Sequence, residues 1–144
     1  MADGTAMVDV ETALRTYLMT DAVQDRLTNF SGSNIKVFTY EFNSDQENVP
    51  NTCIMVRDAG GAGNPYLNES NTLFQVWVRS DSVDTAKTLI ARVDDELQRL
   101  GPKAISDDVF CLMMIRNSGK QRFDDPESQL VQYAITYRSA MRRI

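Results

Sequence analysis

Histidine is absent from the 144 residues of this chain, and histidine is the side chain that serves most often as a general base and as a metal ligand. Cysteine is scarce. Cys53 and Cys111 both lie within runs typical of strands, so we expect buried, reduced thiols rather than a disulfide or a nucleophile. These absences argue against serine and cysteine hydrolases and predict a protein that is not an enzyme and needs no cofactor.

Long hydrophobic runs are also missing. No stretch approaches the roughly 20 apolar residues that a membrane-spanning helix requires. The first residues carry neither the basic segment nor the apolar stretch of an export signal. We therefore expect no membrane partner and an intracellular site of synthesis.

Composition places the chain among ordinary globular proteins. The sequence is 42% hydrophobic and 24% charged, and its length suits a single domain over residues 1–144. The net formal charge is −5, and the isoelectric point is near 4.7. This acidic balance argues against a broad basic face that wraps nucleic acid.

The spacing of hydrophobic residues predicts helices and strands in the order α, β, β, β, α, β, β, with a short second helical stretch after the first helix. Helices are expected over 9–18, 21–27 and 84–100, and Gly101-Pro102 ends the last of them. Strands are expected over 35–42, 52–58, 73–79, 109–115 and 130–142. The pattern predicts the α+β class, with a mostly antiparallel or mixed sheet of about five strands and helices packed on one face.

Two segments between the strands are predicted to be surface loops. The first, 59–71, begins with Ala59-Gly60-Gly61-Ala62-Gly63-Asn64-Pro65, which is rich in turn-forming residues. It lacks the Lys-Ser/Thr of a phosphate-binding loop and leads into a strand rather than a helix. The second, 116–128, is polar and contains Asp124-Asp125-Pro126.

Apolar residues occur on both faces of the last two predicted strands. In the strand 109–115, one face is expected to hold Val109, Cys111, Met113 and Ile115 and the other Phe110, Leu112 and Met114. In the final strand, one face is expected to hold Val131, Tyr133, Ile135 and Tyr137, and the other to receive Leu130, Ala134 and Met141. Helices can cover one face, so the other requires either strong sheet curvature or a partner subunit. We favour the partner.

Charged residues offer few candidate sites. The acidic pairs Asp94-Asp95, Asp107-Asp108 and Asp124-Asp125 are interpreted as solvated faces, because nothing in the sequence brings them together into a metal site. Two basic clusters, Arg116, Lys120 and Arg122 in the second loop and Arg138, Arg142 and Arg143 near the C-terminus, are interpreted as partners of the acidic majority, with contact to DNA as the alternative. Trp77 shares its predicted face with Gln75 and Arg79 and is either a core or an interface residue.

From Asn51 onward, the order of motifs resembles the minor capsid or tail terminator proteins of tailed bacteriophages. The stretch Val56-Arg57-Asp58-Ala59-Gly60-Gly61 is its most telling part, followed by the strand 74–80, the helix 84–100 and the closing Tyr133-Ala134-Ile135-Thr136-Tyr137-Arg138. The resemblance covers about two thirds of the chain, and the N-terminal helix fits it more loosely.

The resemblance implies a structural virion protein, located in the tail or neck and in the host cytoplasm during assembly. Such proteins form hexameric rings at the head-proximal end of the tail, contact the tail tube protein and the head–tail connector, and let DNA pass without sequence-specific binding. It places the contact segments in 60–71 and 116–128. The candidate contact residues are Arg57, Asp58, Gly60, Gly61, Asn64, Tyr66, Trp77, Arg79, Arg116, Lys120 and Arg122.

Two other functions stay open at this point. A head completion or stopper protein would bind the portal side of the same junction and would have a similar sequence. A divalent-metal nuclease or another acidic-site enzyme would require carboxylates that converge on one cleft.

Overall fold

A computed structural model of the chain describes residues 10–28, 35–39, 50–64, 69–107, 109–124 and 129–143; at 10, 58–64, 69–72 and 143 only the backbone is described. The helices are α1 (Val10–Leu18), α2 (Asp21–Thr28) and α3 (Val83–Gln98). The strands are β1 (Val37–Phe38), β2 (Cys53–Asn64), β3 (Glu69–Ser80), β4 (Lys103–Ala104), β5 (Val109–Arg116), β6 (Gln121–Asp124) and β7 (Val131–Arg143). The three helices were all predicted within two residues of these bounds.

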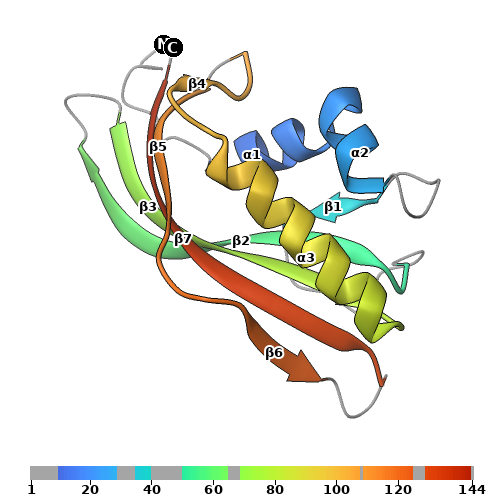
Figure 1. Ribbon diagram of the computed structural model, residues 1–144. Coiled ribbons are helices and arrows are strands. Elements are labelled where there is room, and N and C mark those ends of the chain that lie inside the picture. Colours follow the sequence, from blue (N-terminus) through green and yellow to red (C-terminus); the bar gives the residue numbers. More distant parts are fainter. Residues whose placement is uncertain are drawn as a thin grey trace.

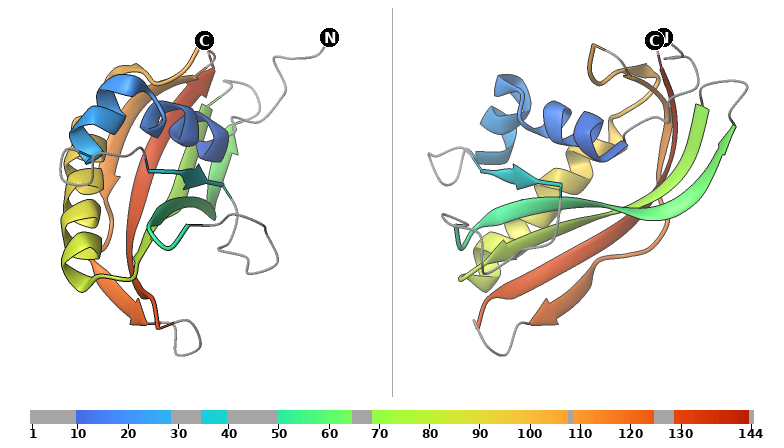
Figure 2. Two further views of the ribbon diagram at one scale, coloured as in Figure 1. Left: turned by 90° about the vertical axis from the view of Figure 1, so that its right-hand side faces the viewer. Right: turned by 180° about the vertical axis from the view of Figure 1, so that it is seen from behind.

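One sheet contains all seven of these strands. Its order is β1-β2-β3-β7-β5-β4, and β6 pairs with β7. The β1–β2 pair is parallel and the other pairs are antiparallel. The long strands bend, and the helices lie inside the bend on one face of the sheet (Figure 1, Figure 2). The predicted class, α+β with a mixed sheet and helices on one face, is confirmed.

The core lies between α3 and the sheet. Ser82 caps α3, because its side chain accepts a hydrogen bond from the Thr85 amide at 3.3 Å. The predicted apolar stripe of α3 is buried and consists of Ala86, Leu89, Ile90, Val93, Leu97 and, just after the helix, Leu100. Phe74 and Tyr137 stack beneath it with ring centroids 5.4 Å apart. Gly101, with φ of 100°, ends this segment as predicted.

The predicted first loop is wrong over most of its length. Residues 59–64 extend β2 and residues 69–71 belong to β3, so the two strands form a long hairpin; residues 65–68 lie outside the described part. A register shift between Asp58 and Gly60 accommodates the glycine-rich stretch. Pairing of β3 with β7 as far as Glu69 and Arg142 supports this extension, and such pairing overrides weak local strand propensity.

The predicted second loop also contains a strand. Gln121–Asp124 forms β6, which pairs with residues Val131–Ala134 of β7. β5 and β6 therefore follow each other along the same side of β7, since β5 pairs with its C-terminal half. The added strands β4 and β6 raise the sheet from about five strands to seven. Both are short and exposed, which is why hydrophobic alternation did not reveal them.

Two face assignments are corrected by the register. A shift between Cys111 and Met113 in β5 places Met113 and Ile115 on the face opposite Cys111. In β7, Met141 lies on the same face as Tyr137, because the pairing with β3 is uninterrupted and alternate residues share a face. Of the strand predicted over 35–42, the described residues contain β1 (Val37–Phe38), and 40–42 lie outside the described part.

Candidate assembly surface

The sheet face turned away from the helices is here called the outer face. Alternation and register assign its residues. Its described side chains are Phe38, Cys53, Met55, Arg57, Leu73, Gln75, Trp77, Arg79, Ala104, Phe110, Met113, Ile115, Gln121, Phe123, Gln132, Ala134, Thr136, Arg138, Ala140 and Arg142. Cys53 and Met55 are buried, and most of the others are half-buried or exposed.

Large hydrophobic side chains are exposed at three places in the described part of the chain, and all three are on the outer face. Met113 is 36% exposed, Ile115 49% and Phe123 43%. They belong to β5 and β6, which both pair with β7 on the side away from β3. The register shift in β5 is what turns Met113 and Ile115 outward. A folded protein gains nothing by presenting this apolar surface to water, so a covering partner is expected.

Two aromatic side chains meet on this face. The rings of Trp77 on β3 and Phe123 on β6 lie 5.1 Å apart. Between them, β7 contributes Ala134, which pairs with both Trp77 and Gln121 and is small enough to let the rings touch across it. Trp77 Nε1 donates a hydrogen bond to Gln75 Oε1 at 3.2 Å. Trp77 is thus a half-buried residue of the outer face rather than of the main core.

The charged side chains that are described on the outer face are all arginines, while Glu69, which pairs with Arg142, holds an outer-face register position by its backbone. The arginines are Arg57, Arg79, Arg138 and Arg142, and no Asp or Glu occupies an outer-face position whose side chain is described. Arg79 Nη2 donates to the Pro50 carbonyl at 2.7 Å, and the Arg142 guanidinium lies 5.8 Å from the centre of the Phe110 ring. The face therefore combines apolar side chains with positive charge.

Both cysteines are free and buried, as predicted. Burial raises the pKa of the Cys53 thiol to about 11, although nearby Arg79 acts in the opposite direction. Burial also raises the pKa of Cys111. A neutral thiol is a poor nucleophile, so neither residue has the properties of a catalytic cysteine.

The eleven predicted contact residues fall into separate groups. Arg57, Trp77 and Arg79 share the outer face. Asp58, Gly60, Gly61 and Asn64 are strand residues of β2 rather than loop residues, and their side chains are not described. Tyr66 lies outside the described residues.

The remaining three predicted contacts face the helix side or the edge of the sheet. Arg116 Nη1 pairs with Asp94 Oδ2 at 2.9 Å, and Arg122 pairs with Asp124 at 2.8 Å. Lys120 Nζ lies 5.2 Å from the centre of the Tyr133 ring. For Arg116 and Arg122, the interpretation as partners of acidic residues is confirmed.

The candidate contacts named from the sequence did not include six residues that the register places on the outer face: Phe110, Met113, Ile115, Phe123, Arg138 and Arg142. The sequence predicted an apolar sheet face that the helices do not cover. It did not reveal the register shift between Cys111 and Met113 in β5, because hydrophobic alternation assumes an uninterrupted strand. Phe123 lay within the predicted loop. The one signal in the sequence for Phe123 was its position as an isolated aromatic residue between the charged residues Arg122 and Asp124.

Acidic side chains do not assemble into a metal site in the described part of the chain, where no group of three potential ligands occurs. Asp94 was predicted to be solvated, and this is wrong: Tyr137 Oη donates to Asp94 Oδ1 at 2.6 Å, beside the Arg116 pair. Asp95 is exposed, as expected. Among the described helices, none is long and apolar enough to cross a membrane.

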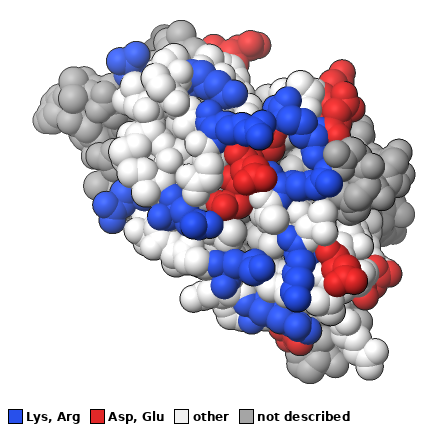
Figure 3. Space-filling view, in the orientation of Figure 1, with Lys and Arg blue, Asp and Glu red and all other residues white. Residues whose placement is uncertain are grey.

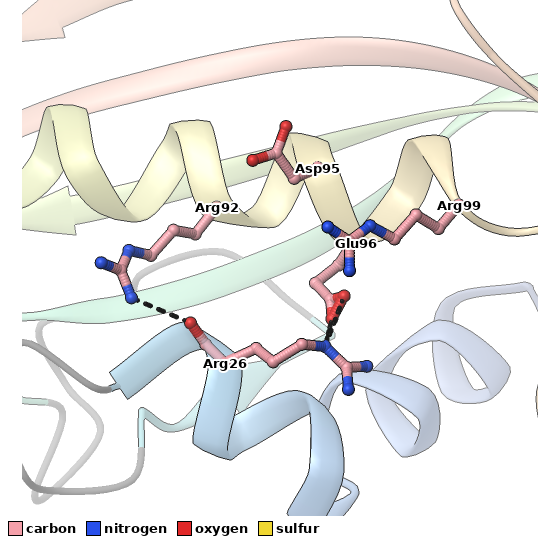
Figure 4. A pocket seen from close by; sticks show the side chains of 5 residues that line it. All are labelled: Arg26, Arg92, Asp95, Glu96 and Arg99. Carbon is pink, nitrogen blue, oxygen red and sulfur yellow. Dashed lines mark hydrogen bonds and ion pairs between the residues drawn. The ribbon is translucent and has the colours of Figure 1, made fainter.

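A pocket of about 260 Å³ lies on the opposite side of the molecule, between α2 and α3. Its lining residues are Arg26, Arg92, Asp95, Glu96 and Arg99 (Figure 4). Arg26 forms an ion pair with the buried Glu96, and Arg92 Nη1 donates to the Arg26 carbonyl at 3.0 Å. These contacts hold α2 against α3, so we interpret the pocket as a structural contact between two helices.

Comparison with known proteins gives a likeness of fold. No protein-family model matches the sequence, and neither does any curated protein. Among solved structures, the fold is similar to a chain in a structure described as the virion of a native gene transfer agent particle, with a TM-score of 0.62. The identity is 17%, over 92% of this chain and 93% of the other. The two chains thus share a fold over nearly their whole lengths.

Proposed function

We propose that this chain is a structural protein of a phage-like virion, of the tail terminator type. It forms a ring, hexameric by analogy with that family, at the head-proximal end of the tail. There it stops polymerisation of the tail tube and joins the tail to the head connector. The observation that carries the proposal is the nearly full-length fold likeness to a chain of a gene transfer agent virion.

The outer face supports an assembly role. Three exposed large hydrophobic residues gather on one face of the sheet, which is the arrangement expected of a surface that a partner covers. Neither the buried thiols nor the acidic side chains suggest catalysis. The role is in the particle, and the chain acts by binding other virion proteins and copies of itself.

Particles assembled without the chain provide the test. We expect electron microscopy to show tails of irregular length that are not joined to heads, because nothing stops the tube or offers a surface to the connector. Restoring the chain in trans should restore uniform, joined tails. Uniform joined tails in its absence would refute the proposed role.

A head completion or stopper protein is the second candidate, favoured by the same fold likeness. Affinity purification of the tagged chain from assembling cells separates the two. Recovery of tail tube protein supports the terminator, whereas recovery of the portal without tail tube protein supports the stopper. A metal-dependent nuclease is a third and weaker candidate, and a rise in melting temperature on titration with Mg²⁺ or Mn²⁺ would revive it.

A further inference from the structure

The pocket between α2 and α3 is lined by charged side chains. Its five lining residues are Arg26, Arg92, Asp95, Glu96 and Arg99, and its volume is about 260 Å³. Arg26 comes from α2, and the other four lie on α3 or at its C-terminal cap. Pockets that hold cofactors or drug-sized ligands are mostly apolar and about 300–1,000 Å³ in volume. This pocket is smaller and polar, so it suits a charged group that belongs to a larger partner.

Positive charge exceeds negative charge on the inward side of the pocket. Glu96 is buried and forms an ion pair with Arg26. Asp95 is exposed, and Figure 4 shows its carboxylate turned away from the other four side chains. Three guanidinium groups therefore face one carboxylate. Figure 3 likewise shows Lys and Arg side chains grouped over the helices on this side of the molecule. An anion is the complementary ligand.

Arg99 offers a guanidinium that the fold does not use. It follows the last residue of α3 and is exposed. Its backbone amide caps the helix, but its side chain forms no hydrogen bond or ion pair within the described part of the chain. Figure 4 shows this side chain turned back along α3 toward Glu96, over the pocket.

Contacts within the protein hold the other two arginines in place. Arg26 Nε donates to both carboxylate oxygens of Glu96, and Arg92 Nη1 donates to the Arg26 carbonyl at 3.0 Å. A guanidinium has five N–H donors in a planar fork that matches a carboxylate, so each arginine retains donors for a ligand. Side chains that are already positioned lose less freedom on binding.

We propose that this pocket binds an acidic segment of a partner protein through the carboxylates of that segment. Arg99 binds one carboxylate, and Arg92 binds a second at the other end of the pocket. The inference goes beyond the proposed function, because the pocket lies on the helix side of the sheet and its ligand does not depend on the tail terminator role.

The spacing of the two arginines defines the segment. Arg92 and Arg99 are seven positions apart, so their Cα atoms lie about 10 Å apart along the helix axis. Figure 4 shows their guanidinium groups at opposite ends of the Arg26 side chain. A polyproline II segment repeats every three residues and rises about 3.1 Å per residue. Acidic residues three positions apart in such a segment lie on one side, about 9 Å apart, and match the two arginines.

The acidic residues around the pocket argue against nucleic acid as the occupant. Asp25, next to Arg26 on α2, and Asp95 are both exposed. A nucleic acid strand carries a negative charge at every nucleotide and extends beyond a pocket of this size, so its further phosphates would meet these carboxylates. A peptide can place its two acidic residues in the pocket and neutral or basic residues beside Asp25 and Asp95.

A defined peptide tests the site. The probe is the capped peptide Gly-Glu-Pro-Pro-Glu-Gly with a fluorescein label, titrated with the full chain at low ionic strength and followed by fluorescence anisotropy. We expect saturable binding to the wild type. The same peptide with Gln in place of both Glu residues should bind at least tenfold more weakly. Equal binding of the two peptides would overturn the proposal, and so would the absence of saturable binding to the folded wild type.

Charge reversal at Arg99 tests the assigned contact. We expect Arg99→Glu to weaken binding of the acidic peptide at least tenfold. Lys87→Glu is the matched control, because it makes the same charge change at an exposed position of α3 outside the pocket, and it should change the affinity less than twofold. Thermal melting checks that each variant is folded, and Arg99→Gln replaces Arg99→Glu if that variant is not.

Arg99 also lies at a helix C-terminus, where a positive charge is stabilising. A lower melting temperature with unchanged peptide binding in the Arg99 variants would show that this residue serves the helix end, and it would overturn the proposal. Fluorescence anisotropy with a labelled 20-nucleotide single-stranded DNA should show no saturable binding at the pocket. DNA binding that Arg99→Glu abolishes, without binding of the acidic peptide, would replace the peptide with nucleic acid as the occupant.

Discussion

Glu96 is an acidic residue of α3 with just 2% of its surface exposed, and its charge is balanced by Arg26 on α2. Glu96→Gln keeps the shape but removes the charge, which leaves the Arg26 guanidinium without its ion-pair partner. Because Arg26 is about half exposed, water offsets part of the loss. We expect the free energy of unfolding to fall by about 1–2 kcal/mol, measured by urea denaturation.

The exposed pair between Arg122 and Asp124 provides the control for this measurement. Both side chains are about half exposed, and exposed ion pairs contribute little. We expect Arg122→Gln to leave the free energy of unfolding unchanged within the precision of the measurement. Equal losses in the two variants would contradict the structural role assigned to the α2–α3 contact.

Cys53 makes the stability of the fold depend on alkaline pH. Its pKa rises from 9.0 to about 11 on burial, so the folded protein retains the thiol proton at pH values where the unfolded chain has lost it. Stability from this group is complete below pH 9 and falls as the pH rises toward 11. We expect the wild type to lose about 2 kcal/mol more than Cys53→Ala over this range, measured by denaturation at each pH. Parallel losses in the two proteins would show that Cys53 is accessible to water.

At the level of single residues, the sequence predicted which side chains are buried better than it predicted which residues form hydrogen bonds and ion pairs with one another. The two thiols and the stripe of α3 are buried as the pattern indicated, because apolar periodicity reports burial directly. Asp94 was misjudged because its partners Arg116 and Tyr137 are 22 and 43 residues away in the chain. No local pattern in the sequence encodes such distant contacts.

Among the elements, α3 depends on its N-terminal cap. The Thr85 amide donates to Ser82 Oγ at 3.3 Å, and without this acceptor the amide loses its side-chain partner. We expect Ser82→Ala to lower the free energy of unfolding by about 1 kcal/mol. We expect Ser82→Asp to retain most of the stabilisation that the cap provides, because a carboxylate can accept the same hydrogen bond. Thermal denaturation of both variants measures the difference. Equal melting temperatures for Ser82→Ala and the wild type would contradict the capping role.

Strand β6 is attached to the sheet by few contacts. All four of its residues are exposed, and the ring of Phe123 packs against that of Trp77. We expect Phe123→Ala to speed amide exchange in β6 about tenfold, with a loss of less than about 1 kcal/mol in global stability. Hydrogen exchange with mass spectrometry measures both effects. Ile115→Ala on β5 is the matched control and should leave exchange in β6 unchanged.

Elements with strong hydrophobic periodicity were predictable, and those held by pairing were not. α3 and the central part of β3 alternate clearly in sequence and were found at their predicted places. The end of β2 contains three glycines over 60–63 and looks like a loop, but β3 continues beside it and is itself paired with β7. Backbone pairing between distant segments supplies the stability that local propensity lacks.

For the whole molecule, the sequence indicated that one face of the sheet has apolar residues that the helices do not cover, but it did not indicate which residues these are. Apolar residues on both faces of β5 indicated that one sheet face needs a cover. The shift at Leu112 then decides which of those residues point outward. The exposed apolar residues of the resulting outer face are the feature of the fold that supports the proposed assembly role.

The mass of the chain in solution tests self-assembly into a ring most directly. Size exclusion with light scattering should be run over a wide concentration range, alone and with tail tube protein, followed by negative-stain imaging. For six copies of the 16.2 kDa chain, the account predicts a species of 97.2 kDa that appears as a ring. A monomer under every condition, or a closed dimer that grows no further, would contradict it.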